Sequence, residues 1–301
     1  SDVYKRQYPS YAQWMTTASP SYEAGMTAQG HLQLDQAILS VAYQPQEGFG
    51  GVVDLASGES VSGQGGSVGG TGSASIALTQ AYLQHKSGSL TIDAGRFYTS
   101  SGYEVFSVAD NLFVSRSELF NRETTYHTGL RAVYALNDSL SLKVGALNNV
   151  FANRSESRAT LENKAFELGA KWAASDSLSL AATLYQSKAE TDLVSVVATY
   201  KFSDDFSVAL NADQANGAQI NDYTAVALYG AYRLNDNVKV GIRIEEINPG
   251  QKNVNGTGAL AAVVSYSLNN NLDIRTELSN IDEEGAKPRR MAAAIQGVLK
   301  F

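Results

Sequence analysis

The sequence predicts an all-β fold, a transmembrane antiparallel up-and-down β-barrel, from a repeated turn, an alternating strand pattern and the absence of long apolar runs. Five times from residue 134 onward in the 301-residue chain, an aromatic residue lies three positions before a short turn rich in Asn, Asp and Ser. These residues bond their own main chain and tolerate left-handed backbone, so they favour tight hairpins. Aromatic residues beside the turns suit a membrane interface. We therefore expect an interface girdle of Tyr134, Trp172, Tyr200, Tyr232 and Tyr266.

The alternation within the strands indicates which face meets lipid. In the stretch 238–245, aliphatic side chains alternate with residues that include Lys239, Arg243 and Glu245, and other stretches repeat this pattern. A water-filled interior would hydrate the charged face, while the apolar face would contact acyl chains. A large soluble antiparallel sheet with one solvated face would show the same period. Such a sheet, however, has no reason to place an aromatic residue beside each turn.

Fifteen stretches are expected to form strands. Because bacterial single-chain barrels have even strand numbers, we expect about sixteen strands in the complete protein, with the missing first strand placed before Tyr8. Fourteen or eighteen strands are the alternatives. The Gly- and Ser-rich stretch 58–73 is expected to be a loop. The fifteen stretches are residues 31–44, 48–57, 74–85, 89–98, 124–136, 140–149, 164–174, 178–188, 192–202, 206–215, 222–234, 238–247, 257–268, 272–281 and 291–301.

The start of the chain, residues 1–7, fits no strand. Its sequence, Ser-Asp-Val-Tyr-Lys-Arg-Gln, resembles a non-native, adapter-derived segment. Together with the odd strand number, this indicates an N-terminally truncated chain, and a mature N-terminus or an extracellular segment is the alternative. We expect residues 8–301 to form a single transmembrane β-barrel domain.

The composition narrows the classes of protein that this chain can represent. With no cysteines, the chain has neither a disulfide framework nor a Cys-ligated metal site. The formal net charge of −7 argues against nucleic acid as a partner. The sequence contains no run of about 18 apolar residues, the length that a transmembrane helix requires. Its mean hydropathy of −0.19 is compatible with strands in which every second residue faces lipid.

The longest connection between expected strands, 99–123, is also strongly apolar. It combines a helix-like spacing of apolar residues over 110–120 with several charged residues. A loop this long and this apolar would not stay extended in water, so we expect it to fold into the barrel and narrow the pore. Glu104, Arg116 and Arg122 are expected to line this constriction. An external lid with a short surface helix is the alternative.

Charged side chains on the inward parity of the later strands are expected to line the pore. From the fifth expected strand onward this parity carries nine basic and five acidic residues, so we expect a mild preference for anions. The net negative charge of the chain then lies largely on the loops, where salt screens it. The expected pore-lining residues are Arg131, Lys143, Glu167, Lys171, Lys201, Asp213, Arg233, Lys239, Arg243, Glu245, Asp273, Arg275 and Glu277, with Lys300 as a further basic residue of the same parity.

Several short motifs between residues 31 and 150 resemble the OmpL-like family of β-barrel porins from Gram-negative bacteria. The motifs are Gly95-Arg96-Phe97, Gly102-Tyr103-Glu104, Ser115-Arg116-Ser117 and His127-Thr128-Gly129. The resemblance implies an outer-membrane porin through which small hydrophilic solutes or ions diffuse passively, with no cofactor. It also implies contact with outer-membrane lipid and lipopolysaccharide. The family pattern fixes neither the solute nor the oligomeric state.

Two other classes of function were weighed against a porin. A barrel plugged by its own loops could act as a structural anchor or as a ligand-binding receptor, and sequence separates it poorly from a porin. An outer-membrane barrel hydrolase is less favoured, because His127 lacks an Asn-His-x-Ser pattern and suits a hydrogen-bonding role better than that of a catalytic base. No cluster of His with Asp or Glu has metal-ligand spacing. We therefore expect neither an enzyme nor a metal site.

The C-terminal stretch ends on Phe301 and alternates Met291, Ile295 and Leu299 with more polar neighbours. This pattern resembles the terminal strand signal through which barrels are recognised by the outer-membrane assembly machinery. A last strand that only closes the barrel would look the same. Both roles are compatible with each other.

Overall fold

The structure, a computed structural model, describes residues 11–19, 29–58, 61, 67–69, 76–151, 164–187, 192–217, 222–250, 255–283 and 290–300. The regular elements in these ranges are strands and two short turns of 3-10 helix. The strands are β1 Tyr11–Ser19, β2 Gln29–Tyr43, β3 Gly48–Ser57, β4 Ser67–Gly69, β5 Ile76–Ser87, β6 Leu90–Tyr98, β7 Tyr126–Ala135, β8 Leu140–Leu147, β9 Ala165–Ala173, β10 Leu178–Ser187, β11 Asp192–Lys201, β12 Phe206–Asn216, β13 Tyr223–Arg233, β14 Val238–Pro249, β15 Thr257–Ser267, β16 Leu272–Glu283 and β17 Arg290–Lys300.

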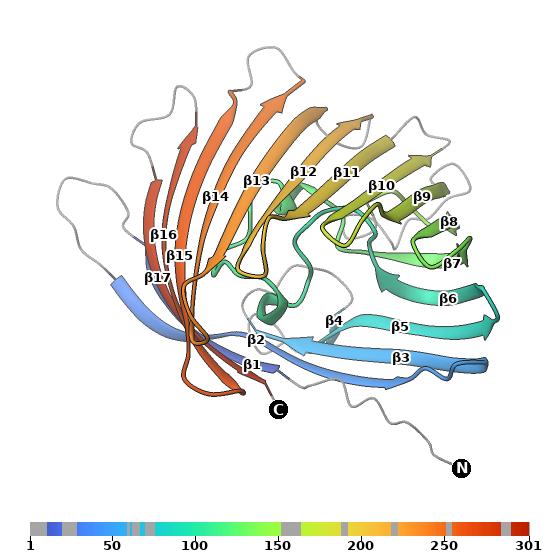
Figure 1. Cartoon of the computed structure of the whole chain (residues 1–301), viewed down its shortest axis with the longest axis horizontal. Coiled ribbons are helices and arrows are strands. Elements are labelled where there is room, and N and C mark those ends of the chain that lie inside the picture. The colour runs from blue at the N-terminus through green and yellow to red at the C-terminus, as the bar shows by residue number, and fades with distance from the viewer. Residues whose placement is uncertain are drawn as a thin grey trace.

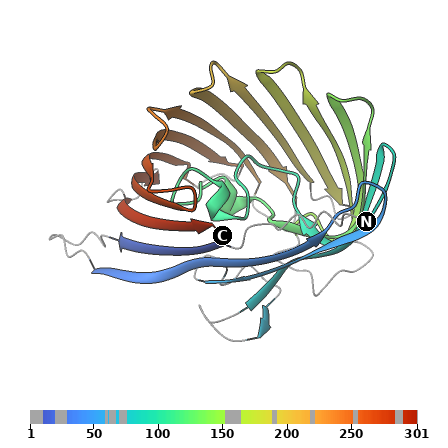
Figure 2. The ribbon, with the colours of Figure 1, turned by 60° about the horizontal axis from the view of Figure 1, so that its bottom comes forward.

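The strands form one antiparallel sheet that closes on itself. Successive strands pair in sequence order, and β1 pairs with both β2 and β17. Of the seventeen strands in the sheet, only the three-residue β4 lies outside the ring, so sixteen described strands make up the barrel wall. Figures 1 and 2 show this wall curving around an interior that the connection between β6 and β7 enters. The all-β, up-and-down barrel predicted from the sequence is confirmed.

Two details of the expected strand layout were wrong. The first strand was placed before Tyr8, yet β1 lies at Tyr11–Ser19, where its sequence lacks a clear apolar face. The stretch 58–73 was expected to contain no strand, but it contains β4, which pairs with β5. The expected fifteen strands therefore omit β1. Residues 1–7 lie outside the described residues.

The two faces of the wall differ in exposure as the alternation predicts. In β9, Phe166 and Leu168 are 71% and 57% exposed, whereas Glu167 between them is 2% exposed. Large aliphatic residues are likewise exposed on the outside of most other strands, for example Ile242 and Ile244 of β14. Because a membrane barrel turns its apolar side chains toward lipid, the outer surface has the composition that the bilayer requires.

The five repeated turns are tight hairpins built by their first polar residue. The Asn137 Oδ1 atom accepts hydrogen bonds from the backbone N–H groups of Ser139 and Leu140, both at 2.9 Å. Ser175, Ser203, Asn235 and Asn269 each accept the equivalent two bonds. The aromatic residue before each turn is 41% to 50% exposed on the outer face. Anchoring at a membrane interface stays a prediction for these five residues.

The interior of the barrel is crossed by the connection between β6 and β7, residues 99–125, which we call the inner segment (Figure 1). Phe113, Val114 and Leu119 of this segment are buried in an apolar cluster with side chains of the wall. The helix-like spacing over 110–120 does not give a helix, since the segment contains only the 3-10 turns η3 Val108–Asp110 and η4 Phe120–Arg122. In the part of the chain that the structure describes, no helix has the length and apolar character needed to cross a membrane.

The last strand, β17, pairs with β16 and β1. Met291, Ile295 and Leu299 point outward, while Gln296 and Val298 are fully buried. Phe301, the expected assembly signal, lies outside the described residues, and its role stays a prediction.

Candidate functional site

The inner segment is fixed to the wall by Arg243 of β14. The guanidinium of Arg243 donates to Glu245 Oε1 at 2.8 Å and to Glu104 Oε1 at 3.0 Å. It also donates to Ser115 Oγ and to the carbonyl oxygens of Ser115 and Arg116, at 3.0 to 3.1 Å. All three charged side chains are at most 3% exposed. Because an ion pair in such a buried place has little competition from water, this cluster is a firm anchor for the inner segment.

Two charged residues of β16 hold the next part of the segment by its backbone. The carboxylate of Glu277 accepts hydrogen bonds from the N–H groups of Val114 and Ser115, at 2.6 and 3.2 Å. The guanidinium of Arg275 donates to the carbonyl oxygens of Val108 and Ala109, both at 3.1 Å. Charged side chains of the wall thus form hydrogen bonds with backbone groups of the inner segment that would otherwise have no partner.

The beginning of the segment is held by β10, β11 and β12 on the neighbouring part of the wall. The hydroxyl oxygens of Tyr185 and Ser195 accept bonds from the N–H groups of Ser100 and Gly102, at 2.9 and 3.1 Å. Gly102 has a φ of +85°, and a side chain there would place its Cβ 2.2 Å from a carboxylate oxygen of Glu123. A φ of this value is readily adopted by glycine and strained for other residues. On the far side, Gln36 of β2 accepts a bond from Val108 N–H at 2.9 Å and donates to Phe106 O at 3.2 Å.

The segment carries titratable groups that its burial has shifted. Burial, with a contribution from the negative charge of Asp213 on β12, raises the pKa of Glu123 well above its usual value. Burial lowers the pKa of Arg116, although Glu104 opposes this effect. Burial also raises the pKa of Tyr103.

The residues expected at the constriction take different positions. Glu104 joins the Arg243 cluster, and it also accepts a bond from the Ser117 N–H at 2.9 Å. The Arg116 guanidinium donates to the Phe106 carbonyl oxygen and lies over the Phe120 ring, 4.5 Å from its centroid. Arg122 lies in η4, apart from that cluster, and its carbonyl oxygen accepts a bond from the Tyr223 hydroxyl at 3.5 Å.

Besides Arg243, Glu245, Arg275 and Glu277, which contact the inner segment, the expected pore-lining residues fall into three groups. Arg131 and Glu167 form a second buried pair, at 2.7 Å, below the start of the segment. Arg233 pairs with Asp205 at 2.8 Å in an exposed position near the short turns. The third group lies elsewhere on the inner parity: Lys143 and Lys171 line one cavity, Lys201 and Lys239 line another, Asp213 accepts a bond from Asn211, and Asp273 accepts one from Ser267.

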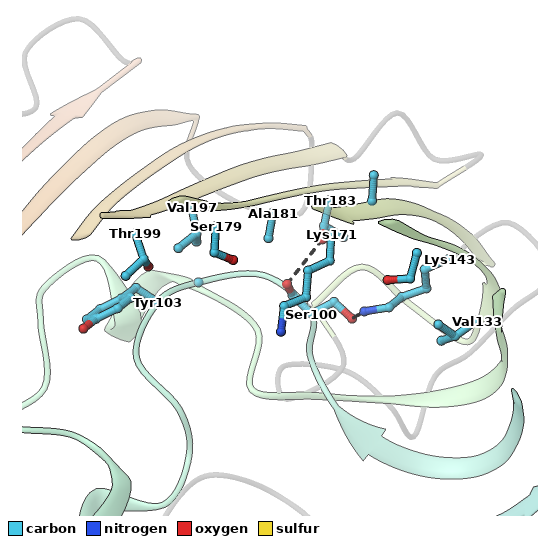
Figure 3. A pocket seen from close by; sticks show the side chains of 13 residues that line it. Ser100, Tyr103, Val133, Lys143, Lys171, Ser179, Ala181, Thr183, Val197 and Thr199 are labelled. Carbon is cyan, nitrogen blue, oxygen red and sulfur yellow. Dashed lines mark hydrogen bonds between the residues drawn. The ribbon is translucent and has the colours of Figure 1, made fainter. Parts of the chain in front are cut away.

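A cavity of about 450 Å³ remains between the inner segment and the wall of β8 to β11. Lys143 and Lys171 extend from this wall toward the segment, and the Lys143 ammonium donates to Ser100 Oγ (Figure 3). Tyr103 and Thr199 lie at the other end of the cavity in the same view. A second cavity of about 490 Å³ lies near the short turns and is lined by Lys201, Asp204, Asp205, Arg233 and Lys239, among others.

Sequence reasoning missed several residues of this site. Tyr229 of β13 has the inward parity and lies 4.4 Å, between ring centroids, from Tyr103. Its place in an alternating stretch indicates that its side chain points inward. Ser115 and Asn211 bond across the interior to partners more than 90 positions away. No local pattern identifies such partners.

The surroundings of His127 support a structural role for this residue. It is fully buried, and its Nδ1 atom lies 3.1 Å from the Asn149 carbonyl oxygen. Its ring also stacks near the Tyr185 ring, 4.5 Å away between centroids. Among the residues that the structure describes, no group of three or more His, Cys, Asp or Glu side chains could hold a metal ion.

Comparisons with known proteins agree with this architecture. A family model described as "Putative beta-barrel porin-2, OmpL-like" matches residues 11–288. No curated protein matches the chain by sequence. The fold is similar to that of the outer-membrane channel DcaP of Acinetobacter baumannii, with a TM-score of 0.70, 15% identity and coverage of 97% of this chain and 96% of that chain.

Two further solved structures have the same fold. OmpT of Vibrio cholerae matches with a TM-score of 0.68 and 13% identity, over 98% of each chain. A mutant of Rh. blastica porin matches with a TM-score of 0.66 and 17% identity, over 97% of this chain and 99% of that chain. At these identities the likeness establishes the fold alone.

Proposed function

Because this chain belongs to the OmpL-like β-barrel porin family, whose model matches residues 11–288, we propose that it lets small hydrophilic solutes and ions diffuse passively across the outer membrane. The observation that carries the proposal is the space beside the inner segment. The cavities of about 450 and 490 Å³ are both lined by charged and hydroxyl side chains. Such side chains hold water, and water is what a permeating solute needs along its path.

The inner segment sets the size limit in this proposal. It crosses the interior and is bonded to the wall strands β2, β10, β14 and β16. The anchors are buried ion pairs and backbone bonds rather than loose contacts, so the segment stays in place while solutes pass. The remaining cross-section then favours solutes of the size of single sugars over larger ones.

Swelling of proteoliposomes tests this function. We expect vesicles that contain the folded protein to swell in an iso-osmotic pentose or hexose, and to swell more slowly in a trisaccharide, because the narrowed lumen excludes larger solutes. Folding is checked by the mobility of unheated and heated samples on a gel. Protein-free vesicles are the control.

The plugged-barrel alternative gives a different result in this assay. Folded protein that causes no more swelling than protein-free vesicles with any sugar would show that the inner segment closes the lumen. The chain would then act as an anchor or receptor rather than as a porin.

A further inference from the structure

The cavity between the inner segment and β8 to β11 concentrates positive charge. Lys143 on β8 pairs with Gly169, and Lys171 lies two residues further along β9 on the same face. Diagonal neighbours across two antiparallel strands lie within about 8 Å of each other. Both lysines line the cavity and extend toward the segment (Figure 3). Their ammonium groups can therefore act on one small ligand.

Nearby carboxylates form no ion pair with these two lysines among the residues that the structure describes. Glu167, on the strand next to Lys143, is already held by Arg131 through two bonds of 2.7 and 3.0 Å. An ammonium group has three donors, and Lys143 directs one of them to Ser100. Positive charge and free donors thus remain for a ligand.

Neutral donors complete the lining. The hydroxyl groups of Ser141, Ser179 and Thr199 line the same cavity. Oxyanions are bound well by ammonium groups together with hydroxyl donors. A volume of about 450 Å³ is large enough for a small organic ion with its water.

The other basic cavity makes a useful contrast. It contains Lys201 and Lys239, but Asp204 and Asp205 line it as well, and Asp205 pairs with Arg233. Its charges are therefore largely balanced, although its volume is similar. The cavity beside the inner segment differs in that no carboxylate is among the described residues that line it.

We propose that Lys143 and Lys171 form a binding site for small dianions that carry oxyanion groups, such as dicarboxylates or phosphate. The inference rests on the proposed function, because it names the class of solute that the channel selects. A dianion would bridge the two ammonium groups and take further bonds from the hydroxyl lining. Neutral sugars would pass the same cavity without being held.

Lysine acetylation in detergent tests this site without requiring any flux. The folded protein is treated with an acetylating reagent, and the modification of Lys171 and of Lys239 is followed by peptide mass spectrometry. Both side chains are exposed to the lumen, so Lys239 is a control within the same molecule. We expect succinate to protect Lys171 but not Lys239, at constant ionic strength set with chloride.

A variant and a second probe make the test specific. In Lys143→Gln, the succinate concentration for half-protection of Lys171 should rise about tenfold, because one charge-assisted contact is lost. Protection by phosphate as well as succinate would support a general oxyanion site, and protection by succinate alone would support a carboxylate site. Equal protection of Lys171 and Lys239, equal protection by chloride, or no protection at all would overturn the proposal.

The outcome is independent of the swelling assay. Protection of Lys171 in a protein that causes no swelling would keep the binding site and overturn the porin. Swelling without protection would keep the porin and overturn the binding site.

Discussion

Ile242→Arg should destabilise the barrel by about 2–4 kcal/mol, the cost of an arginine facing lipid near the middle of a bilayer. Ile242 lies on the outer face of β14 and is 48% exposed, with Gly230 and Ala262 as its strand partners. The next residue, Arg243, is 3% exposed inside the barrel. Neighbouring residues of a strand thus face lipid and the barrel interior in turn. The loss of unfolding free energy caused by an arginine substitution should therefore alternate along the strand with a period of two.

The measurement is a urea titration of unfolding in lipid vesicles. Thr199→Arg is the matched control, because Thr199 lines the cavity beside the inner segment and its replacement would point into the lumen. We expect a loss below about 1 kcal/mol there, since the added charge stays hydrated. Equal losses for Ile242→Arg and Thr199→Arg would contradict the assignment of the outer face to lipid.

Arg243→Ala should cost about 3–5 kcal/mol, because it leaves two buried carboxylates without their cation. Glu104 and Glu245 are 3% and 1% exposed at their side chains, so water cannot replace the lost guanidinium. The same change removes three bonds to Ser115 and Arg116, which fix the path of the inner segment.

Arg233→Ala is the control for this prediction. Arg233 has the same residue type and the same inward parity, but its pair with Asp205 is exposed, with side chains 41% and 54% exposed. Exposed pairs of this kind contribute at most about 1 kcal/mol. In addition, changing Glu104 and Glu245 to Gln in the Arg243→Ala background should restore part of the stability. Similar losses for both arginine variants, or no restoration, would show that the cluster is not an anchor.

The barrel itself could be predicted from sequence because its rules are local. A period of two assigns each residue of a strand to the inside or the outside. The Asn and Ser residues that begin the short turns make their bonds to residues two and three positions ahead. All the residues that produce such signals lie within one hairpin. β1 escaped notice because its short sequence, Tyr-Ala-Gln-Trp-Met-Thr-Thr-Ala-Ser, does not separate apolar from polar residues.

The interior could be predicted only in outline. Parity placed Arg243 and Glu277 inside, but their partners Glu104 and Ser115 lie on a segment with no strand alternation to indicate where its side chains point. Which charges neutralise each other therefore could not be known from sequence. The expected preference for anions rests on a count of charged residues, and two of the basic ones, Arg131 and Arg243, are held in buried ion pairs. Their partners Glu167 and Glu245 belong to the acidic side of the same count, so the difference between the two sides is unchanged and the preference stays a prediction.

The central claim is that the inner segment narrows a water-filled channel, and single-channel conductance in a planar bilayer tests it most directly. Deletion of residues 106–120 removes the part of the segment that packs on β14 and β16. The charged groups that held it, such as Arg243 and Glu277, would then face the lumen and become hydrated. We expect the deletion variant to fold and to conduct more strongly than the native protein, because ion flow rises with the free cross-section. A folded variant with unchanged conductance would contradict this account, since the segment would then lie outside the path of the ions.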